Sequence, residues 1–264
     1  MNPKGVQPGA PPALPPIRRV SLGRPLRWLL LGWRDFTRAV LPSAAHGLAA
    51  ALGGLAILVI AWGHFHLLSG AFSGFLLVGP LLATGLYELS RRLAAGEPAN
   101  FAAALVAWKR GGRPLLSLGL LLMLAGTFWV LVSAVLIALF VKAPITGMES
   151  FLRHVVIAED SNLFLIWVGL GGLLASLVFA ATVVAVPLLL DRDVDMPTAM
   201  LASVQAVAEN PLPMAFWAAL IMLLTLIGMA PLLLGLVLAI PVLGHASWHA
   251  YSDLVDASGL PPRR

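Results

Sequence analysis

Long apolar segments alternate with short polar connections along most of this chain. Between Ala39 and Tyr251 the sequence contains six such segments that are almost free of charge. A helix needs about 20 apolar residues to cross a bilayer, and these segments have that length. The pattern therefore predicts an all-α, polytopic membrane helix bundle with six transmembrane helices, at about 40–63, 68–90, 114–141, 163–190, 212–229 and 231–252.

The last two spans come from one uninterrupted apolar stretch, residues 212–251. As a single helix it would be about 60 Å long at 1.5 Å per residue, twice the thickness of the hydrocarbon layer. Gly228 and Pro231 lie near its middle, and glycine with proline is typical of a turn. We therefore divide the stretch into two helices. One tilted, proline-kinked helix that runs on into water remains as the alternative.

A pair of prolines brackets the segment before each odd-numbered span: Pro25 to Pro42, Pro98 to Pro114, and Pro197 to Pro213. Proline favours the first turn of a helix and blocks its continuation, so each pair can enclose a short helix. Each segment has an apolar helical face, which predicts an amphipathic helix in the headgroup layer. The sequence then reads as three copies of an interfacial helix followed by a transmembrane hairpin. The third segment is acidic, so we expect it to pack on protein. The unequal spacing of the prolines leaves a chance repetition open.

Basic residues are concentrated in particular connections. Seven of the 17 lysines and arginines precede the first span, and five more lie between the second and third spans. By the positive-inside rule these segments are cytoplasmic, and an even number of spans returns the C-terminus to the same side. We expect a disordered tail over residues 1–19, a transmembrane domain over 20–256 and a C-terminal tail over 257–264. No signal peptide pattern follows the first basic residues.

Composition excludes several classes of protein. Hydrophobic residues make up 59% of the chain and charged residues 11%, which is unlike a soluble domain. No cysteine is present, so disulfides and thiolate metal sites are excluded. The net charge of +5 fits attraction to anionic lipid headgroups better than nucleic-acid binding, which would need a folded basic domain. The expected partners are thus the lipid bilayer and its anionic headgroups.

The interiors of the predicted spans contain few residues that could bind an ion or catalyse a reaction. No Asp, Glu, Lys or Arg lies near the expected midplane of any span, whereas ion-coupled transporters usually keep a charge there. Small residues such as Gly70 and Gly74, which form a GxxxG pair, favour close helix packing and leave a homo-oligomer or a membrane-protein partner open. Motifs of nucleotide-binding, hydrolytic and zinc-protease sites are missing from the sequence, so nothing supports an enzyme.

Polar residues gather at the predicted cytoplasmic ends of the even-numbered spans. His245 and His249 are four residues apart, hence on one helical face, and can bind one divalent metal. Carboxylates from the other two ends could complete the site, so the candidate metal ligands are His245, His249, Asp191, Asp193 and Glu88. The alternative is an ordinary interfacial belt of aromatic and histidine side chains with salt-bridged carboxylates.

Four local phrases taken together resemble a known family. They are Gly32 to Phe36 (GWRDF), Gly79 to Arg92 (GPLLATGLYELSRR), Pro187 to Asp195, and Gly244 to Tyr251 (GHASWHAY). Over about residues 20–256 the chain resembles the bacterial integral membrane family called domain of unknown function 2189. The resemblance implies a multi-helix protein of the bacterial cytoplasmic (inner) membrane with no established activity. Some relatives carry the label of cytochrome c oxidase subunit, but these histidines lie near span ends rather than deep in the spans.

Three hypotheses for function follow. The first is a non-enzymatic scaffold, interaction or assembly protein that acts through its packing surface. The second is a small-molecule transporter or channel built from the three hairpins, which requires a water-filled cavity reaching the midplane. The third is a metal- or haem-associated respiratory accessory protein that uses His245 and His249.

Overall fold

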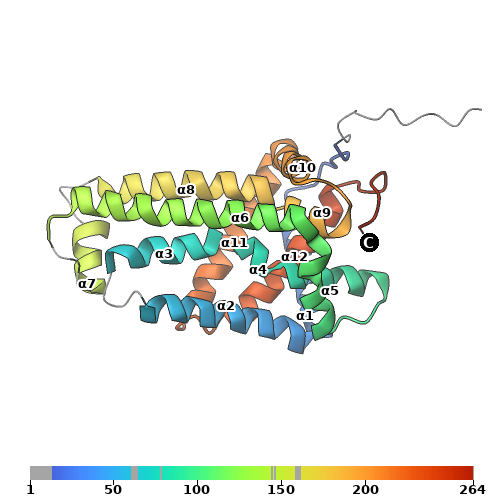
Figure 1. The fold of residues 1–264 in the computed structure, drawn as a ribbon, viewed down its shortest axis with the longest axis horizontal. Helices are drawn as coiled ribbons and strands as arrows, with labels where there is room; N and C mark the ends of the chain where they lie inside the picture. The colour runs from blue at the N-terminus through green and yellow to red at the C-terminus, as the bar shows by residue number, and fades with distance from the viewer. Residues whose placement is uncertain are drawn as a thin grey trace, which may run out of the picture.

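In the computed structural model, the longest helices run side by side along one long axis, and several shorter ones lie across it (Figure 1). The structure describes residues 14–60, 65–77, 79–143, 145, 147–157 and 162–263. The predicted N-terminal tail up to residue 13, the end of the first predicted span at 61–63 and Arg264 lie outside them. The helices are α1 (Arg24–Arg38), α2 (Val40–Ile60), α3 (Phe65–Leu77), α4 (Gly79–Leu82), α5 (Thr84–Ala95), α6 (Phe101–Phe140), α7 (Met148–Phe151) with a π-helical turn (Leu152–Val156), α8 (Leu163–Thr182), α9 (Ala185–Asp191), α10 (Met196–Glu209), α11 (Pro211–Met229) and α12 (Leu236–Leu254).

The all-α prediction is confirmed for the described residues, which contain only two isolated β-bridges besides helices and turns. Four helices are long and apolar enough to cross a membrane: Val40–Ile60, Lys109–Phe140, Leu163–Asp191 and Pro211–Met229. The second predicted span, 68–90, is divided among three helices, α3 to α5. The short middle helix, α4, begins with Gly79 and Pro80, and proline cannot donate the backbone hydrogen bond that would continue a preceding helix. A crossing of the membrane by all six segments stays a prediction.

The stretch 212–251 forms two helices, as predicted. Helix α11 ends at Met229 and α12 begins at Leu236, so the alternative of one kinked helix is wrong. Leu232 and Leu233 adopt the left-handed backbone conformation, with φ of 50° and 69°, which reverses the chain direction between the two helices. Gly228 and Gly235 lie so close that a Cβ on Gly235 would be 2.7 Å from the Cα of Gly228.

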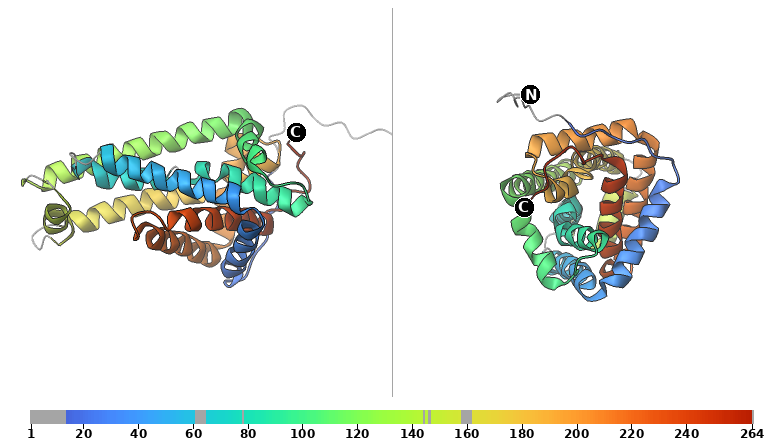
Figure 2. Two further views of the ribbon diagram at one scale, coloured as in Figure 1. Left: turned by 90° about the horizontal axis from the view of Figure 1, so that it is seen from below. Right: turned by 90° about the vertical axis from the view of Figure 1, so that its right-hand side faces the viewer.

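All three proline-bracketed segments are helical. They are α1, residues 101–111 at the start of α6, and α10. The first part of α6 is set off by a kink at Gly112, whose φ of 58° and ψ of −156° suit glycine. Seen end-on in Figure 2, α1 (blue), the start of α6 (green) and α10 (orange) run around the outside of one end of the bundle. We call these three segments the collar.

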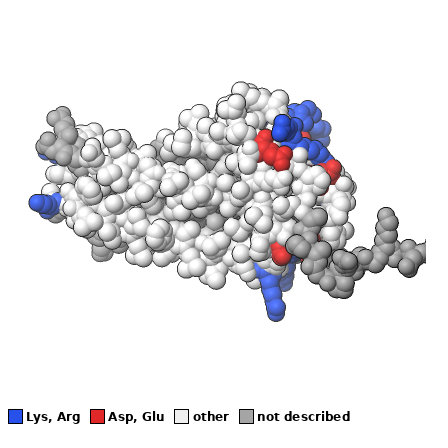
Figure 3. All heavy atoms as spheres, turned by 90° about the horizontal axis from the view of Figure 1, so that it is seen from above, with Lys and Arg blue, Asp and Glu red and all other residues white. Residues whose placement is uncertain are grey.

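Charge separates to the two ends of the molecule. Figure 3 shows most of the visible lysine, arginine and acidic side chains at one end, a few basic ones at the other, and an uncharged surface between. The first end, which carries the collar and the described C-terminal residues, is called the polar end. The opposite end holds the connection from α6 to α8, with α7. The uncharged belt has the character that a bilayer demands of a spanning protein.

Inside the collar, the last turns of α5, α9 and α12 meet; these are the ends of the even-numbered segments that the sequence predicts to be spans. Helices α5, α9 and α12 contact one another, and Leu86, Leu89, Leu189 and Ala250 are fully buried where they meet. These residues belong to one continuous core cluster that also includes Trp28 of α1 and Trp217 of α11. The ends of these helices therefore meet around packed side chains.

Both described chain ends are tied to the polar end. Ile17 pairs with Val255 and Arg192 with Pro262 in antiparallel bridges. The Arg263 guanidinium donates to the carbonyl oxygens of Gly111 (2.7 Å), Val194 (2.9 Å) and Arg192 (3.0 Å). Residues 14–19 and 257–263, which we assigned to tails from the sequence, thus lie against the helical domain.

Helix α1 crosses α12 at very short range. A Cβ on Gly32 would lie 2.5 Å from the carbonyl oxygen of Val242 and 2.7 Å from the amide nitrogen of Ala246. Both neighbours are backbone atoms of α12, so they cannot move aside as a side chain tip could. The crossing therefore requires glycine at position 32.

We predict that Gly32→Ala destabilises the protein, because overpacking of this kind costs about 1–3 kcal/mol. The melting temperature in detergent should fall by several degrees. Gly172→Ala in α8 is the matched control, because a Cβ there meets nothing within 4 Å; it should melt at or slightly above the wild-type temperature. Equal melting temperatures for the two variants would contradict the close crossing.

Candidate functional site

Five polar side chains meet beneath the collar, where α1, α2, α5 and α12 come together. They are Asp35, Ser43, Ser90, His245 and His249, and we call them the Asp35 network. Asp35, Ser43, Ser90 and His245 are buried, and the His249 side chain is 19% exposed. A buried polar cluster is unfavourable unless its members pair with one another.

The backbone of α1 brings Asp35 into this interior position. Pro25, Trp28, Gly32 and Asp35 form the buried face of α1, with spacings of three and four residues that place them on one side of the helix. Because Gly32 lets α1 approach the backbone of α12, the carboxylate one turn further on reaches the histidines of α12.

The hydrogen bonds of the network converge on the Asp35 carboxylate. Ser90 Oγ donates to Asp35 Oδ2 at 2.7 Å, so its lone pair accepts from His245 Nδ1 at 2.8 Å. His245 Nε2 then faces Ser43 Oγ at 2.8 Å, where neutral imidazole accepts the serine proton. His249 Nε2 donates to the same Asp35 oxygen at 2.8 Å. One carboxylate thus anchors side chains from three other helices.

The environment of Asp35 favours its ionised form. Burial raises the pKa of the carboxyl group, but hydrogen bonds from His249 and Ser90 outweigh that effect and hold the pKa below its usual value. A carboxylate that accepts several hydrogen bonds is stabilised in the charged state. Asp35 therefore remains an anion in the folded protein at neutral pH.

Three further acidic residues at the polar end have basic or hydroxyl partners. Asp253 accepts from Arg24 Nε at 2.6 Å and from Trp28 Nε1 at 2.7 Å. Glu88 receives two hydrogen bonds of 2.8 Å from Arg91 and one of 2.8 Å from Arg92. Asp191 accepts from the Tyr251 hydroxyl at 2.7 Å and from Arg192 Nε at 2.9 Å.

The five predicted metal ligands occupy different surroundings in the structure. His245 and His249 belong to the Asp35 network, whereas Glu88 pairs with arginines. Asp191 pairs with Tyr251 and Arg192, and the exposed Asp193 lies 3.4 Å from Arg263. Among the described residues, no group of three or more His, Asp and Glu side chains is placed to hold a metal ion. The metal site stays a prediction.

Sequence reasoning found the two histidines but missed Asp35, Ser43 and Ser90 as their partners. A signal for Asp35 was present, because it is the only acid among the arginines of α1 and lies on the face of Trp28 and Gly32. Ser90 lies within the phrase that carries the family resemblance. No local pattern marks Ser43, since its role depends on the packing of α2 against α12.

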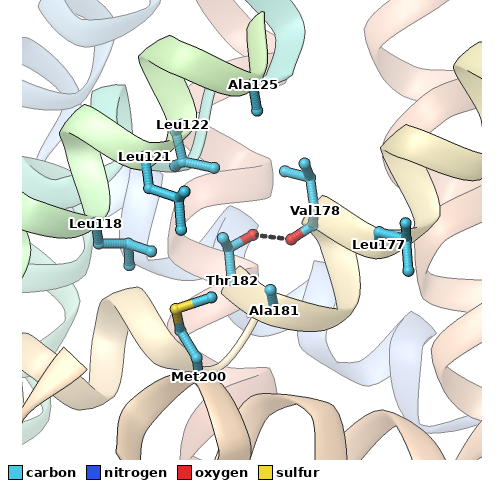
Figure 4. Close-up of a pocket in the computed structure, with 9 residues that line it drawn as sticks. All are labelled: Leu118, Leu121, Leu122, Ala125, Leu177, Val178, Ala181, Thr182 and Met200. Carbon is cyan, nitrogen blue, oxygen red and sulfur yellow. Dashed lines mark hydrogen bonds between the residues drawn. The ribbon is translucent and has the colours of Figure 1, made fainter. Parts of the chain in front are cut away.

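The network lacks the arrangement of a nucleophilic catalyst. In such a site one histidine accepts the nucleophile's proton while the carboxylate orients that histidine. Here the carboxylate contacts Ser90 directly, and His245 lies between two serines. A cavity of about 190 Å³ lies elsewhere, lined by residues of α6, α8 and α10 that include Leu118, Thr182 and Met200. Figure 4 shows its lining to be apolar except for Thr182, whose hydroxyl bonds to the Val178 carbonyl.

The fold and this paired interior define a helical integral membrane protein. Residues 67–191, from α3 to α9, match the model of the family described as predicted integral membrane protein, DUF2189 (domain of unknown function 2189). The resemblance predicted from the sequence is confirmed over that range, which includes Ser90, Glu88 and Asp191. No curated protein and no solved structure matches this chain.

We predict that Asp35→Asn lowers stability at neutral pH and that the difference from wild type shrinks in acid. The pKa of Asp35 is lower in the folded than in the unfolded state, so the unfolded chain binds the proton more tightly. The contribution is complete above the ordinary value of about 3.9 and is lost as the pH falls below it.

The measurement is the melting temperature of both proteins in detergent from pH 7 down to pH 3. Hydrogen bonds to a charged group are worth about 1.5–3 kcal/mol, so a gap of several degrees is expected at pH 7. Glu149→Gln, at a well-exposed position, should follow the wild type throughout. A gap that is constant with pH would refute the role assigned to the Asp35 carboxylate.

Proposed function

We propose that the protein is a non-enzymatic scaffold or assembly component of the membrane, which acts through its surface rather than through an internal site. The observation that carries this proposal is the closed meeting of α5, α9 and α12 around fully buried side chains. A transporter or an enzyme needs space for its substrate at the point where polar groups converge. Here the convergent polar groups bond to one another.

The breaks in the even-numbered spans also favour a scaffold over a transporter. Transporters use unwound helix segments at the midplane to bind substrate through free backbone groups. At the break between α8 and α9, the Val184 amide donates to Ser203 Oγ of α10 at 3.1 Å. At the break before α5, the amides of Ala83 and Tyr87 bond to Gly79 and Ala83. These amides are therefore already paired within the protein.

The collar provides a surface suited to the interfacial layer of the bilayer. Each collar segment turns a tightly packed face inward, including Trp28, Ala104 and Ala199, and leaves apolar side chains exposed on the outside. The exposed set is Leu26, Leu30, Trp33, Phe101, Leu105, Leu201 and Val204. Amphipathic helices of this kind lie at the boundary between headgroups and acyl chains. On this proposal the collar surrounds the cytoplasmic end of the protein, with both termini on that side.

Helix α1 adds a positive charge to this surface. Arg27, Arg34 and Arg38 are exposed, and no ion pair involving them occurs within the described part of the chain. The acid of the same helix, Asp35, points inward to His249 and Ser90. An outward face of apolar and basic residues without acids favours anionic lipid headgroups.

We predict that positions in the middle of the bundle are closed to water from both sides. The chain lacks cysteine, so an introduced cysteine is the only thiol that a reagent can label. Ala51→Cys and Thr225→Cys place it at buried positions of α2 and α11. A charged, membrane-impermeant thiol reagent should label neither in sealed vesicles of either orientation. Ser252→Cys, at an exposed position of the polar end, should react from the cytoplasmic side. Rapid labelling of either buried position would favour a transporter.

We predict that the triple variant Arg27→Gln, Arg34→Gln, Arg38→Gln loses its preference for anionic lipid. Each basic residue near such a surface is worth about 1 kcal/mol. The motionally restricted fraction of spin-labelled phosphatidylglycerol around the reconstituted protein should fall toward the value for phosphatidylcholine. The phosphatidylcholine fraction serves as the control and should not change. An undiminished preference for phosphatidylglycerol would show that α1 does not select the lipid.

A further inference from the structure

The turn between α11 and α12 is unusual because it is entirely apolar. Residues 230–235 read Ala-Pro-Leu-Leu-Leu-Gly, and Thr225 is the only polar side chain between Asn210 and His245. Leu232 is 84% exposed and Leu234 68% exposed. A connection that emerges into water normally carries polar residues, because exposed leucines there are unfavourable. The composition of this turn indicates contact with hydrocarbon.

Contacts with α2 fix how far the turn extends along the bundle. Leu233 packs on Ala51 in a small cluster, and a Cβ on Gly54 would lie 2.9 Å from its side chain. Ser43, at the Asp35 network, precedes Gly54 by 11 residues of α2, or about 16 Å at 1.5 Å per residue. The hydrocarbon layer is about 30 Å thick. The turn therefore lies near its middle when the network lies at its cytoplasmic edge.

The ribbon views also show how far the turn lies from the polar end. In Figures 1 and 2 the turn between α11 and α12 ends part way along α6 and α8, whose connection extends much further from the polar end. Helix α2 also continues beyond Gly54 to Ile60. Although α11 is long and apolar enough to cross a membrane, its position in the bundle leaves its end short of the far side.

Four backbone amides in and beside the turn are bonded within the protein. The amides of Ala230, Leu233, Leu234 and Leu236 donate to carbonyl groups of residues three or four positions earlier, at 3.0–3.1 Å. Pro231 has no amide hydrogen to satisfy. Non-helical backbone inside a bilayer is tolerated only where its polar groups are bonded within the protein, and these amides meet that condition.

We propose that the α11–α12 hairpin is re-entrant: it enters the bilayer from the polar end, and its tip, residues 230–235, contacts acyl chains without reaching the opposite surface. The inference rests on the proposed placement of the polar end at the cytoplasmic face. Leu233 anchors the tip to α2, and Leu232 and Leu234 face the lipid.

Single-cysteine variants of the full-length protein in oriented vesicles test this proposal. Gly147→Cys, in the connection after α6, should react from the far side with a charged maleimide. Leu232→Cys and Leu234→Cys should react more than about tenfold more slowly from either side, because a charged reagent does not enter hydrocarbon. Reaction of both leucine positions from the far side at the Gly147→Cys rate would overturn the proposal.

A second experiment measures the depth of the hairpin tip in the bilayer directly. A fluorophore attached to Leu232→Cys in detergent, followed by reconstitution, should be quenched most by lipids brominated deep in the acyl chain. Strongest quenching by bromines near the headgroups would overturn the re-entrant hairpin. If Gly147→Cys and Ser252→Cys instead react from the same side, the proposed orientation of the whole protein is wrong, and the quenching depth still decides whether the hairpin is re-entrant.

Discussion

The buried carboxylate of Asp35 is the interaction on which the polar end depends. It accepts hydrogen bonds from α5 and α12, and through His245 it reaches α2. A buried charge is costly unless it is fully paired, so the partners of Asp35 are tied to one geometry. The close approach of α1 to α12 at Gly32 brings the carboxylate to that position. Packing and electrostatics therefore specify the same arrangement of four helices.

This arrangement explains how polar residues gathered at one end of the molecule satisfy one another. Serine and histidine side chains that could otherwise face a ligand are occupied by one another. Arginines pair with the acids of α5 and α9, and the Arg263 guanidinium donates to the Gly111 carbonyl oxygen beside the kink of α6. The collar then encloses this paired interior and presents apolar side chains outward. On the proposed function, the outer surface is the part of the protein that meets lipids and partners.

Local signals were enough to predict part of this fold. Proline and glycine act on the backbone directly, so the division of residues 212–251 and the three proline-bracketed helices could be predicted from spacing alone. The interruption between α3 and α5 was missed, although Pro80 was visible, because the surrounding sequence is apolar enough for one continuous span. Asp35 was missed for a different reason. Its partners on α12 are more than 200 residues away, and hydropathy does not report which face of α1 meets them.

A double-mutant cycle between Asp35→Ala and Ser90→Ala tests the central role of the carboxylate most directly. The free energy of unfolding would be measured for the wild type, the two single variants and the double variant in one detergent. Residues that share a hydrogen-bond network show coupling energies of about 0.5–3 kcal/mol. The account predicts that the double variant is less destabilised than the sum of the two single variants by an amount in that range. Strict additivity would contradict it, because Asp35 and Ser90 would then contribute independently of each other.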